Sequence, residues 1–274
     1  VIKIERPGQG DLSRWSIPDP AGLDNPVFAS LNRNKRSVAL NLKHESAREI
    51  VRELVRSADV IVNNFRPDVM ERMGLGYDRL REENPRIIYA FGTGFGKSGP
   101  YAHKGGQDVL AQAMTGVMAR KADPDHPLAI YATALADYSA AMHLVQGILL
   151  ALLHREKTGK GQMVDVSLYD SMLSMQTQEA SMWLMRKAEL NWAAMPLSGV
   201  FETKDGALVL VGAFKENPLR DISTALEIDD LSREERFSSM ERMRENRSEL
   251  QGIFRKRFRE NTTAHWMERL EAQD

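Results

Sequence analysis

Short apolar strands that alternate with helices are the feature that most restricts the fold of this chain. The strand pattern recurs at residues 1–5, 37–42, 59–62, 87–91 and 163–167. Helical spacing of apolar residues fills the intervals, most clearly at residues 43–58. The strands at 60–62 and 87–91 carry few charges and the connections are short, as in buried parallel sheets. The pattern predicts an α/β fold with a parallel, doubly wound sheet covered by helices on both faces.

The longest apolar stretch, residues 138–153, predicts a helix. It contains His143 and Gln146 and runs into a charged segment at residues 154–157. This stretch is too short and too polar for a bilayer span, which needs roughly 20 apolar residues. We therefore expect a buried helix, residues 137–156, at the centre of a domain, and no membrane association.

The pattern changes near residue 191. Residues 200–211 alternate as a β-hairpin with a turn at residues 204–206, and residues 232–270 have the pattern of strongly charged helices. We expect a large domain at 1–180, a linker at 181–199 and a smaller α+β domain at 200–274. Because the chain opens directly with a strand and without Met, we also expect the large domain to lack its N-terminal strand. The small domain is expected to be cut at its C-terminal end.

The composition argues against several classes of function. The 37 Lys and Arg residues balance 38 Asp and Glu residues, so no net field would draw the chain onto nucleic acid or an anionic membrane. The chain has no cysteine, which rules out disulfides and thiolate catalysis and fits a reducing compartment, here the cytoplasm. Its six histidines lack the spacing of a zinc site, and we expect no metal.

A glycine-rich run at residues 92–99 follows the predicted strand at 87–91. It fails as a phosphate-binding P-loop because Gly92 and Gly96 enclose three residues where the motif has four. It fails as a dinucleotide fingerprint because Pro100 stands where a helix should begin. A flexible loop and a mobile active-site loop both remain open, since parallel sheets bind ligands at the carboxyl ends of their strands.

Two acidic residues stand where predicted helices begin. Asp137 opens the long apolar helix, and Asp108 precedes another helix after Gly105 and Gly106. Each is able to cap its helix, because Asp accepts hydrogen bonds from the first free N–H groups. An Asp at the mouth of a pocket is also able to attack an activated acyl carbon. The residues alone do not separate these two roles for Asp137. For Asp108 the alternative to a cap is a polar group that faces the reacting acyl unit. Asp165 and Asp170, at a strand–helix junction, are expected to be structural.

Basic side chains occur at the ends of several predicted strands and helices. They are Arg6, Lys35, Arg36, Lys43 and Arg72. Singly, each fits a solvated surface charge. Together they fit a basic pocket for the phosphates of a nucleotide cofactor.

An ordered set of short motifs resembles the family III CoA-transferases, which include formyl-CoA transferase and α-methylacyl-CoA racemase. The motifs are VIKIERPG at 1–8, NKRS at 34–37, NNFRP at 63–67, MGLGY at 73–77, GFG with GPY at 94–101, and HR with TGKGQ at 154–162. They keep the family's order and spacing over roughly residues 1–175. The resemblance implies a Rossmann-like large domain, a smaller domain, and two chains interlocked as a homodimer.

The resemblance also implies the chemistry. Asp137 matches the family's catalytic aspartate, whose carboxylate attacks an acyl-CoA thioester to give a mixed anhydride. The released CoA thiolate then forms an aspartyl-CoA thioester, and an acceptor carboxylic acid reverses the sequence. Coenzyme A is thus a substrate, with no tightly bound cofactor. Asp108 matches an acidic position near the acyl group. The positions implied to contact coenzyme A are Arg6, Leu40, Lys43, Asn64, Phe65 and Arg72.

One departure separates the branches of the family. The racemases have a His beside the acidic residue, whereas this chain has Gln107. Glutamine does not accept a proton at neutral pH, so the resemblance favours CoA transfer over α-proton transfer. An acyl-CoA racemase or isomerase remains the alternative enzyme, and a CoA-binding protein without turnover remains the alternative outside catalysis.

Overall fold

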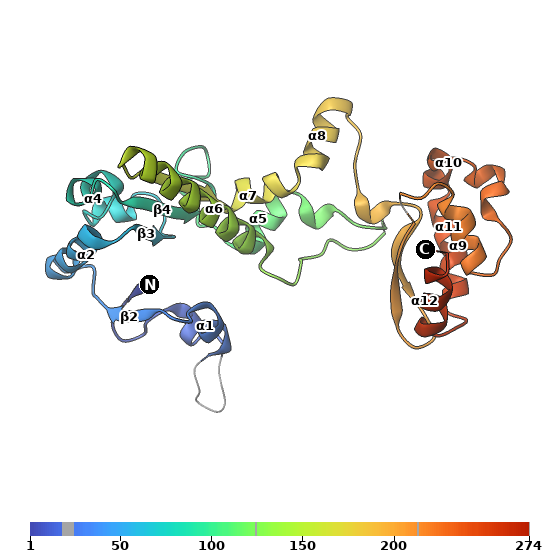
Figure 1. Cartoon of the computed structure of the whole chain (residues 1–274), viewed down its shortest axis with the longest axis horizontal. Helices are drawn as coiled ribbons and strands as arrows, with labels where there is room; N and C mark the ends of the chain where they lie inside the picture. Colours follow the sequence, from blue (N-terminus) through green and yellow to red (C-terminus); the bar gives the residue numbers. More distant parts are fainter. Residues whose placement is uncertain (18–24, 124, 213, 274) are drawn as a thin grey trace. The chain divides into compact units, whose positions relative to one another are not determined.

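The computed structural model describes residues 1–17, 25–123, 125–212 and 214–273. Contacts between residues divide the chain into two compact units (Figure 1). Unit 1 consists of Val1–Ala111 with Thr133–Met175, and unit 2 consists of Gln112–Ala132 with Gln176–Asp274. The chain therefore leaves unit 1 and returns to it before unit 2 is complete. The domain limits expected near 180 and 200 stay a prediction.

Unit 1 begins with a two-stranded parallel sheet. β1 (Ile2–Glu5) pairs with β2 (Arg36–Ala39). The N–H of Leu40 continues the ladder by donating to the Glu5 carbonyl at 2.9 Å. The intervening segment contains η1 (Leu12–Arg14) and α1 (Pro26–Leu31). Because the strands are parallel, the residues that follow β1 and β2 meet at one edge of this sheet.

The buried Glu5 carboxylate fastens the turn that follows β1. Arg14 donates to it from Nε at 2.8 Å and from Nη2 at 2.9 Å. Ser37 Oγ donates at 2.7 Å and the N–H of Asp11 at 2.9 Å. The hydrogen bonding from Arg14 in particular lowers the pKa of Glu5 to about 2, although burial opposes the shift. Glu5 is thus an ionised structural carboxylate that fixes the segment on either side of Arg6.

A second parallel sheet forms the centre of unit 1. Its order is β3 (Val60–Asn63), β4 (Ile88–Thr93) and β5 (Met163–Ser167). The connections contain α2 (Glu45–Ser57), α3 (Val69–Arg72) and α4 (Tyr77–Glu83). The predicted strands and their parallel direction are confirmed. The prediction of one continuous sheet is wrong, because the described strands of unit 1 form two sheets; which strand edges meet depends on long-range packing that strand patterns do not encode.

Helices cover both faces of the three-stranded sheet, as predicted. On one face Tyr89 and Phe91 join a buried cluster with Val51 of α2 and Leu80 of α4. The other face lies against α6 (Leu135–Thr158). The approach is close enough that a Cβ on Gly147 of α6 would lie 2.6 Å from the Val164 side chain.

α6 is the helix expected at residues 137–156, but the prediction that it is buried is wrong. Leu149, Leu150 and Leu153 are 56%, 67% and 63% exposed. In the described part of the chain it is the one helix long and apolar enough to cross a membrane, a test that core helices also pass. Composition identified an apolar helix, yet an apolar side chain does not say which surface covers it.

α6 ends at a glycine. Gly159 has a φ of +74° and donates its N–H to the Arg155 carbonyl at 2.7 Å. This left-handed cap favours glycine because a Cβ is strained there. The side chain of Arg155 is buried and donates to the Asp59 carboxylate at 2.9 Å, so the C-terminal end of α6 is tied to the start of β3.

Three further helices lie near the points in the sequence where the chain passes from one unit to the other. α5 (Asp108–Met114) begins in unit 1 and continues into unit 2. α7 (Leu168–Met175) follows β5 and packs against α6. α8 (Thr177–Arg186) then opens the second segment of unit 2.

Hydrogen bonds fasten residues 112–132 within unit 2. The buried Gln112 side chain accepts from the N–H of Tyr131 at 3.0 Å and donates to its carbonyl at 3.5 Å. Arg120 Nε donates to Gln176 Oε1 at 2.9 Å. These bonds explain why a segment that precedes α6 in the sequence belongs to the C-terminal unit.

The remainder of unit 2 is a hairpin packed on helices, an α+β arrangement. The antiparallel hairpin is β6 (Ser198–Glu202) with β7 (Ala207–Val211). The helices are η2 (Val117–Ala119), η3 (Trp192–Ala194), α9 (Pro218–Ala225), η4 (Leu231–Arg233), η5 (Glu235–Phe237), α10 (Met240–Glu245), α11 (Arg247–Phe258) and α12 (Thr263–Glu271). The predicted hairpin and charged helices are confirmed.

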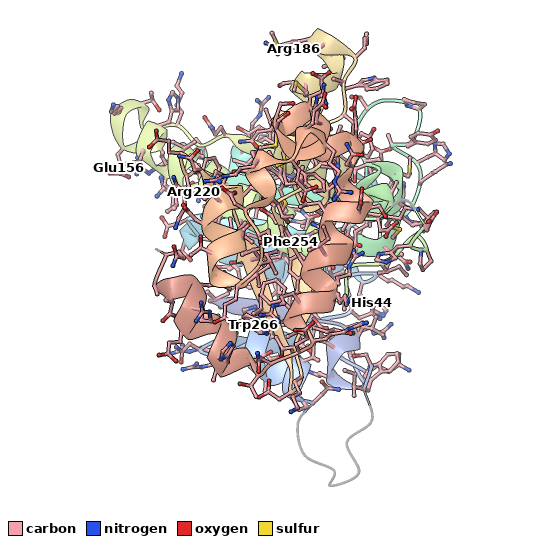
Figure 2. The ribbon with its side chains drawn as sticks, turned by 90° about the vertical axis from the view of Figure 1, so that its right-hand side faces the viewer. His44, Glu156, Arg186, Arg220, Phe254 and Trp266 are labelled. Carbon is pink, nitrogen blue, oxygen red and sulfur yellow. The ribbon has the colours of Figure 1, made fainter. Side chains whose placement is uncertain are left out.

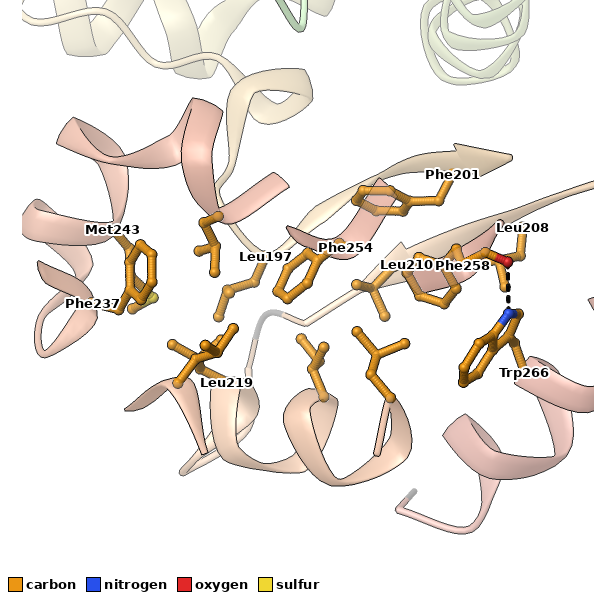
Figure 3. Packing of buried hydrophobic residues seen from close by; sticks show 14 residues of the cluster. Leu197, Phe201, Leu208, Leu210, Leu219, Phe237, Met243, Phe254, Phe258 and Trp266 are labelled. Atoms are coloured by element: carbon orange, nitrogen blue, oxygen red, sulfur yellow. Dashed lines mark hydrogen bonds between the residues drawn. The ribbon is translucent and has the colours of Figure 1, made fainter. Parts of the chain in front are cut away.

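An aromatic cluster forms the core of unit 2. Phe201 of the hairpin lies 5.1 Å from Phe258 between ring centroids, and Phe254 is fully buried beside them (Figure 3). Trp266 Nε1 donates to the Phe258 carbonyl at 2.7 Å, so its one polar atom is satisfied inside the core. Arg220 of the same unit, which Figure 2 labels together with Phe254 and Trp266, is by contrast exposed, and it pairs with Asp221 at 3.2 Å.

Candidate active site

Asp137 lies within the first turn of α6 and does not occupy the N-cap position. The helix begins at Leu135, its N-cap is Ala134, and no side chain of its own caps it. Asp137 is an exposed residue, and in the described residues its carboxylate has no hydrogen-bond or ion-pair partner. Asp137 therefore does not serve as the N-cap, which removes one of the two roles that the sequence left open.

Asp108 supplies the cap instead. Its Oδ2 accepts hydrogen bonds from the N–H of Ala136 at 2.7 Å and from the N–H of Asp137 at 3.0 Å. Asp108 is the first residue of α5 and lies 28 positions before Ala136. Asp108 thus caps α6, a helix other than the one that the sequence predicted it to cap, and this contact joins the Asp108 carboxylate to the backbone of Asp137.

The surroundings change the acidity of Asp137. Loss of solvent around the carboxylate, and secondly the negative charge of Asp108, raise the pKa of Asp137. The N–H groups of Ala136 and Asp137 already donate to Asp108. They therefore offset the increase in the pKa of Asp137 less than free donors would. A carboxylate of raised pKa is a stronger nucleophile once ionised.

Small side chains let α7 approach the first turn of α6. Ala136, Ser139 and Ala140 are buried. Ser139 Oγ donates to the Ser171 carbonyl of α7 at 3.3 Å. The backbone under Asp137 is therefore held from two sides, by Asp108 and by α7.

The glycine-rich loop is anchored. A Cβ on Gly106 would lie 2.1 Å from Gly94 Cα, so the two backbones are in direct contact. The N–H of Tyr169 donates to the Gly94 carbonyl at 3.1 Å. Gly94 is therefore packed against Gly106 and supports the segment that leads to Asp108, while the flexible-loop and mobile active-site-loop interpretations stay predictions. The two glycine clusters were visible in the sequence, but their pairing was not.

Asp165 and Asp170 lie on β5 and at the start of α7. Asp170 accepts from Ser167 Oγ at 2.6 Å, and Ser167 Oγ accepts from the N–H of Asp170 at 2.9 Å. This reciprocal pair closes the first turn of α7. Burial raises the pKa of Asp165, and the charge of Lys97 opposes the shift. The structural role expected of Asp170 is confirmed.

Among the described residues, no group of three His, Asp or Glu side chains is placed to hold a metal.

Comparison with known proteins identifies the family. The model described as CoA-transferase family III matches residues 1–274, the whole chain. The chain belongs to CoA-transferase family III.

Relatives of this family III chain are CoA-transferases by name. An acyl-CoA transferase of Fusarium pseudograminearum is 36% identical over 97% of this chain and 61% of the relative. The succinyl-CoA:glutarate CoA-transferase of Mus musculus is 36% identical over 97% of this chain and 62% of the relative. The crystal structure of a CAIB/BAIF family protein from Brucella suis matches with a TM-score of 0.84 and 31% identity, over 99% of this chain and 74% of that one. The chain thus spans about three fifths of the two curated relatives.

Two of the implied CoA contacts of the family III chain meet at one sheet edge. Arg6 follows β1 and Leu40 follows β2, and the Leu40 N–H to Glu5 carbonyl bond joins these two strand ends. Arg6 is exposed, although its Nε donates to the Gly10 carbonyl at 3.1 Å. Leu40 packs partly against the core. A guanidinium and an apolar side chain that follow neighbouring strand ends are suited to a phosphorylated, partly apolar ligand.

The other implied CoA contacts lie at helix and strand ends of the same unit. Asn64 and Phe65 directly follow β3, Lys43 precedes α2, and Arg72 is the last residue of α3; all four are exposed. A cleft beside Phe65, of about 10 Å³, is lined by Asn63, Arg66 and Lys97 among others. Asn63 Nδ2 is buried there near the Tyr89 hydroxyl, with no hydrogen bond of normal geometry in the described part of the chain. The sequence motif did not single out this donor. The contacts with coenzyme A remain predictions.

Gln107 stands directly before Asp108. It is exposed, and its carbonyl accepts the Ala111 N–H at 3.1 Å as α5 begins. A side chain at this point is adjacent in sequence to the carboxylate that caps α6. With glutamine here, the family III chain has no imidazole to pair with Asp137 at this position.

Proposed function

We propose that the protein transfers coenzyme A from an acyl-CoA to a carboxylic acid, with Asp137 as the nucleophile. One observation carries the proposal: Asp108 caps α6, so the Asp137 carboxylate is not used as the cap. A carboxylate with no partner in the described residues and a raised pKa, at the start of a helix held by its neighbours, is suited to attack. Family membership supplies the class of reaction.

The proposed reaction proceeds through a mixed anhydride, an aspartyl-CoA thioester and a second mixed anhydride, all on Asp137. An Asp137 oxygen attacks the thioester carbonyl, the C–S bond breaks, and CoA leaves as a thiolate from a mixed anhydride. The thiolate attacks the aspartyl carbonyl and expels the first acid as a carboxylate, which leaves an aspartyl-CoA thioester. The acceptor carboxylate attacks this thioester, and the released thiolate then takes the acceptor's acyl group. Asp137 is regenerated as a carboxylate, and no proton is consumed.

Short dicarboxylates are the proposed substrate class. The name of the mouse relative pairs a succinyl donor with glutarate as acceptor. Because the chemistry takes place at one carboxyl group, the second carboxylate is free to be recognised by a basic side chain. Coenzyme A is proposed to contact the residues implied by the family motifs, which are Arg6, Leu40, Lys43, Asn64, Phe65 and Arg72.

Intact-protein mass spectrometry tests the nucleophile, with the protein made from its complete coding sequence. Incubation with succinyl-CoA should add the mass of coenzyme A less one water. Hydroxylamine should convert the adduct to a hydroxamate on the peptide that contains Asp137. The adduct should be absent from Asp137→Ala and present in Asp165→Ala, a matched control whose carboxyl also has a raised pKa.

The outcome with acids completes the test. Glutarate should discharge the adduct and yield glutaryl-CoA. An adduct that persists in Asp137→Ala would refute the assignment. No adduct, together with deuterium incorporation at the α-carbon of a branched acyl-CoA in heavy water, would favour the racemase alternative.

A homodimer is part of the proposal. Met142, Val145, Leu149 and Leu153 of α6 are exposed at helical spacing, and a second copy is proposed to cover them. Leu149→Asp should shift the mass measured by light scattering from dimer to monomer, whereas Leu12→Asp, at an exposed residue outside α6, should not. An unchanged dimer in Leu149→Asp would exclude this face from the interface.

A further inference from the structure

We propose that Asp108 is a positioning residue, whose carboxylate caps the first turn of α6 and thereby holds the Asp137 carboxylate where it attacks. This inference rests on the proposed function. It assigns Asp108 a role on the protein backbone, which differs from the contact with the acyl group that the motif suggested. Asp108 is therefore distinct from a catalytic residue that touches the reacting atoms.

The geometry of the cap supports this role. A single oxygen, Oδ2, takes both N–H groups, from Ala136 at 2.7 Å and Asp137 at 3.0 Å. The second of these bonds is made to the backbone of the proposed nucleophile itself. Ala134 at the N-cap offers no side-chain acceptor. The first N–H groups of α6 therefore depend on the Asp108 carboxylate as their acceptor.

The neighbouring backbone gives Asp108 a fixed place from which to act. Gly106 is locked against Gly94 two residues before Asp108, and the Gln107 carbonyl accepts from Ala111 as α5 begins. The loop after β4 and the start of α5 thus set the position of Asp108, and Asp108 sets the position of Asp137. A displacement of a reacting group by about 1 Å lowers the rate of the chemical step by up to about 100-fold.

The charge of Asp108 adds a second, separable effect. In the described part of the chain Asp108 is the charged group that acts on the Asp137 carboxylate, and it raises the pKa of Asp137. A neutral side chain with the same shape should keep the cap and remove this effect. Asparagine meets that requirement because one amide oxygen is able to accept both N–H groups.

Steady-state kinetics of Asp108 variants test the proposal in the protein made from its complete coding sequence. Asp108→Ala should lower kcat for succinyl-CoA and glutarate by about 100-fold, while KM for succinyl-CoA stays within about twofold because uniform binding is untouched. Asp108→Asn should recover most of kcat. In Asp108→Asn the acid limb of the kcat profile should move to lower pH, since the pKa of Asp137 falls when the neighbouring charge is removed.

Asp205→Ala provides the matched control. Asp205 is also a carboxylate that caps a distant helix, because its Oδ1 accepts from the N–H of Thr263, the first residue of α12, at 2.7 Å. Asp205→Ala should therefore lower the melting temperature without the loss of kcat. If Asp108→Ala and Asp205→Ala lower kcat equally, Asp108 is merely structural and the proposal is overturned.

Other outcomes separate this inference from the proposed function. An Asp137-dependent adduct that forms at the wild-type rate in Asp108→Ala overturns the inference alone. Equal loss of kcat in Asp108→Ala and Asp108→Asn also overturns it, because the cap is then not what matters. An adduct that survives Asp137→Ala overturns the proposed function and the inference together.

Discussion

The two units enclose their apolar side chains to different degrees. Unit 2 surrounds Phe254, Phe258 and Trp266 completely, and even the indole N–H is satisfied inside. Unit 1 buries one face of its central sheet well but leaves Leu149 and Leu150 of its longest helix more than half exposed. The comparison teaches that apolar content is not a measure of burial: one unit uses its apolar side chains for its own core, and the other presents them outward on the helix that also carries Asp137.

The largest effect is expected in the core of unit 2. Phe254→Ala should lower the free energy of unfolding by about 3–5 kcal/mol, because it leaves a cavity beside Phe201. Urea titration followed by Trp fluorescence measures this loss. Phe214, which is 92% exposed, gives the control: Phe214→Ala should change the value by less than about 0.5 kcal/mol. A small effect of Phe254→Ala would mean that unit 2 does not depend on this core.

In unit 1 a single buried carboxylate should matter almost as much. Glu5→Gln should lower the free energy of unfolding at pH 7 by up to about 3 kcal/mol, since the folded pKa of about 2 lies well below the ordinary value of a Glu carboxyl, about 4.5. The contribution is fully present above the unfolded pKa and is lost as the pH falls through the folded one. Melting temperatures of wild type and Glu5→Gln should therefore differ at pH 7 and converge toward pH 2; a difference independent of pH would contradict this origin.

A smaller loss is expected at the glycine contact. Gly106→Ala should cost about 1–3 kcal/mol by overpacking against Gly94, and it should slow adduct formation by displacing Asp108. Gly92→Ala, where an added Cβ meets nothing within 4 Å, is the control for both measurements. Wild-type adduct formation in a folded Gly106→Ala protein would show that this contact does not support the site.

The smallest expected effect is a gain in stability, not a loss, and it comes from replacing Asp137. The folded pKa of Asp137 is raised, so its ionised form destabilises the fold above that pKa, and the effect disappears as the pH falls below the ordinary value. Asp137→Asn should raise stability at pH 7, by no more than about 0.5 kcal/mol because the residue is exposed. Calorimetry at pH 7 and pH 4 measures the difference; a loss of stability at pH 7 would show that Asp137 is a structural carboxylate like Glu5.

Much of the local structure could be predicted from the sequence. Strand and helix periodicity located β1 to β5, α2, α4 and the hairpin of unit 2 because these signals lie within a few residues. The division of unit 1 into two sheets depends on which edges meet, and the exposure of α6 depends on what covers it. Neither property is contained in a local pattern.

The candidate site shows the same limit more sharply. Motifs located Asp108 and Asp137, and helix-end chemistry indicated that an Asp would cap α6. The pattern could not tell which Asp does so, because the capping contact spans 28 positions. Likewise, the glycines at 94 and 106 were conspicuous singly, but their mutual contact depends on the folded path of the chain.

The excursion of residues 112–132 into unit 2 has a consequence for synthesis on the ribosome. Asp108 emerges before the helix that it caps, and β4 emerges before its neighbour β5. A nascent chain that stops within the excursion holds the capping carboxylate but lacks Asp137 and the helix that carries it. The candidate site is therefore completed only after both segments of unit 1 have been made.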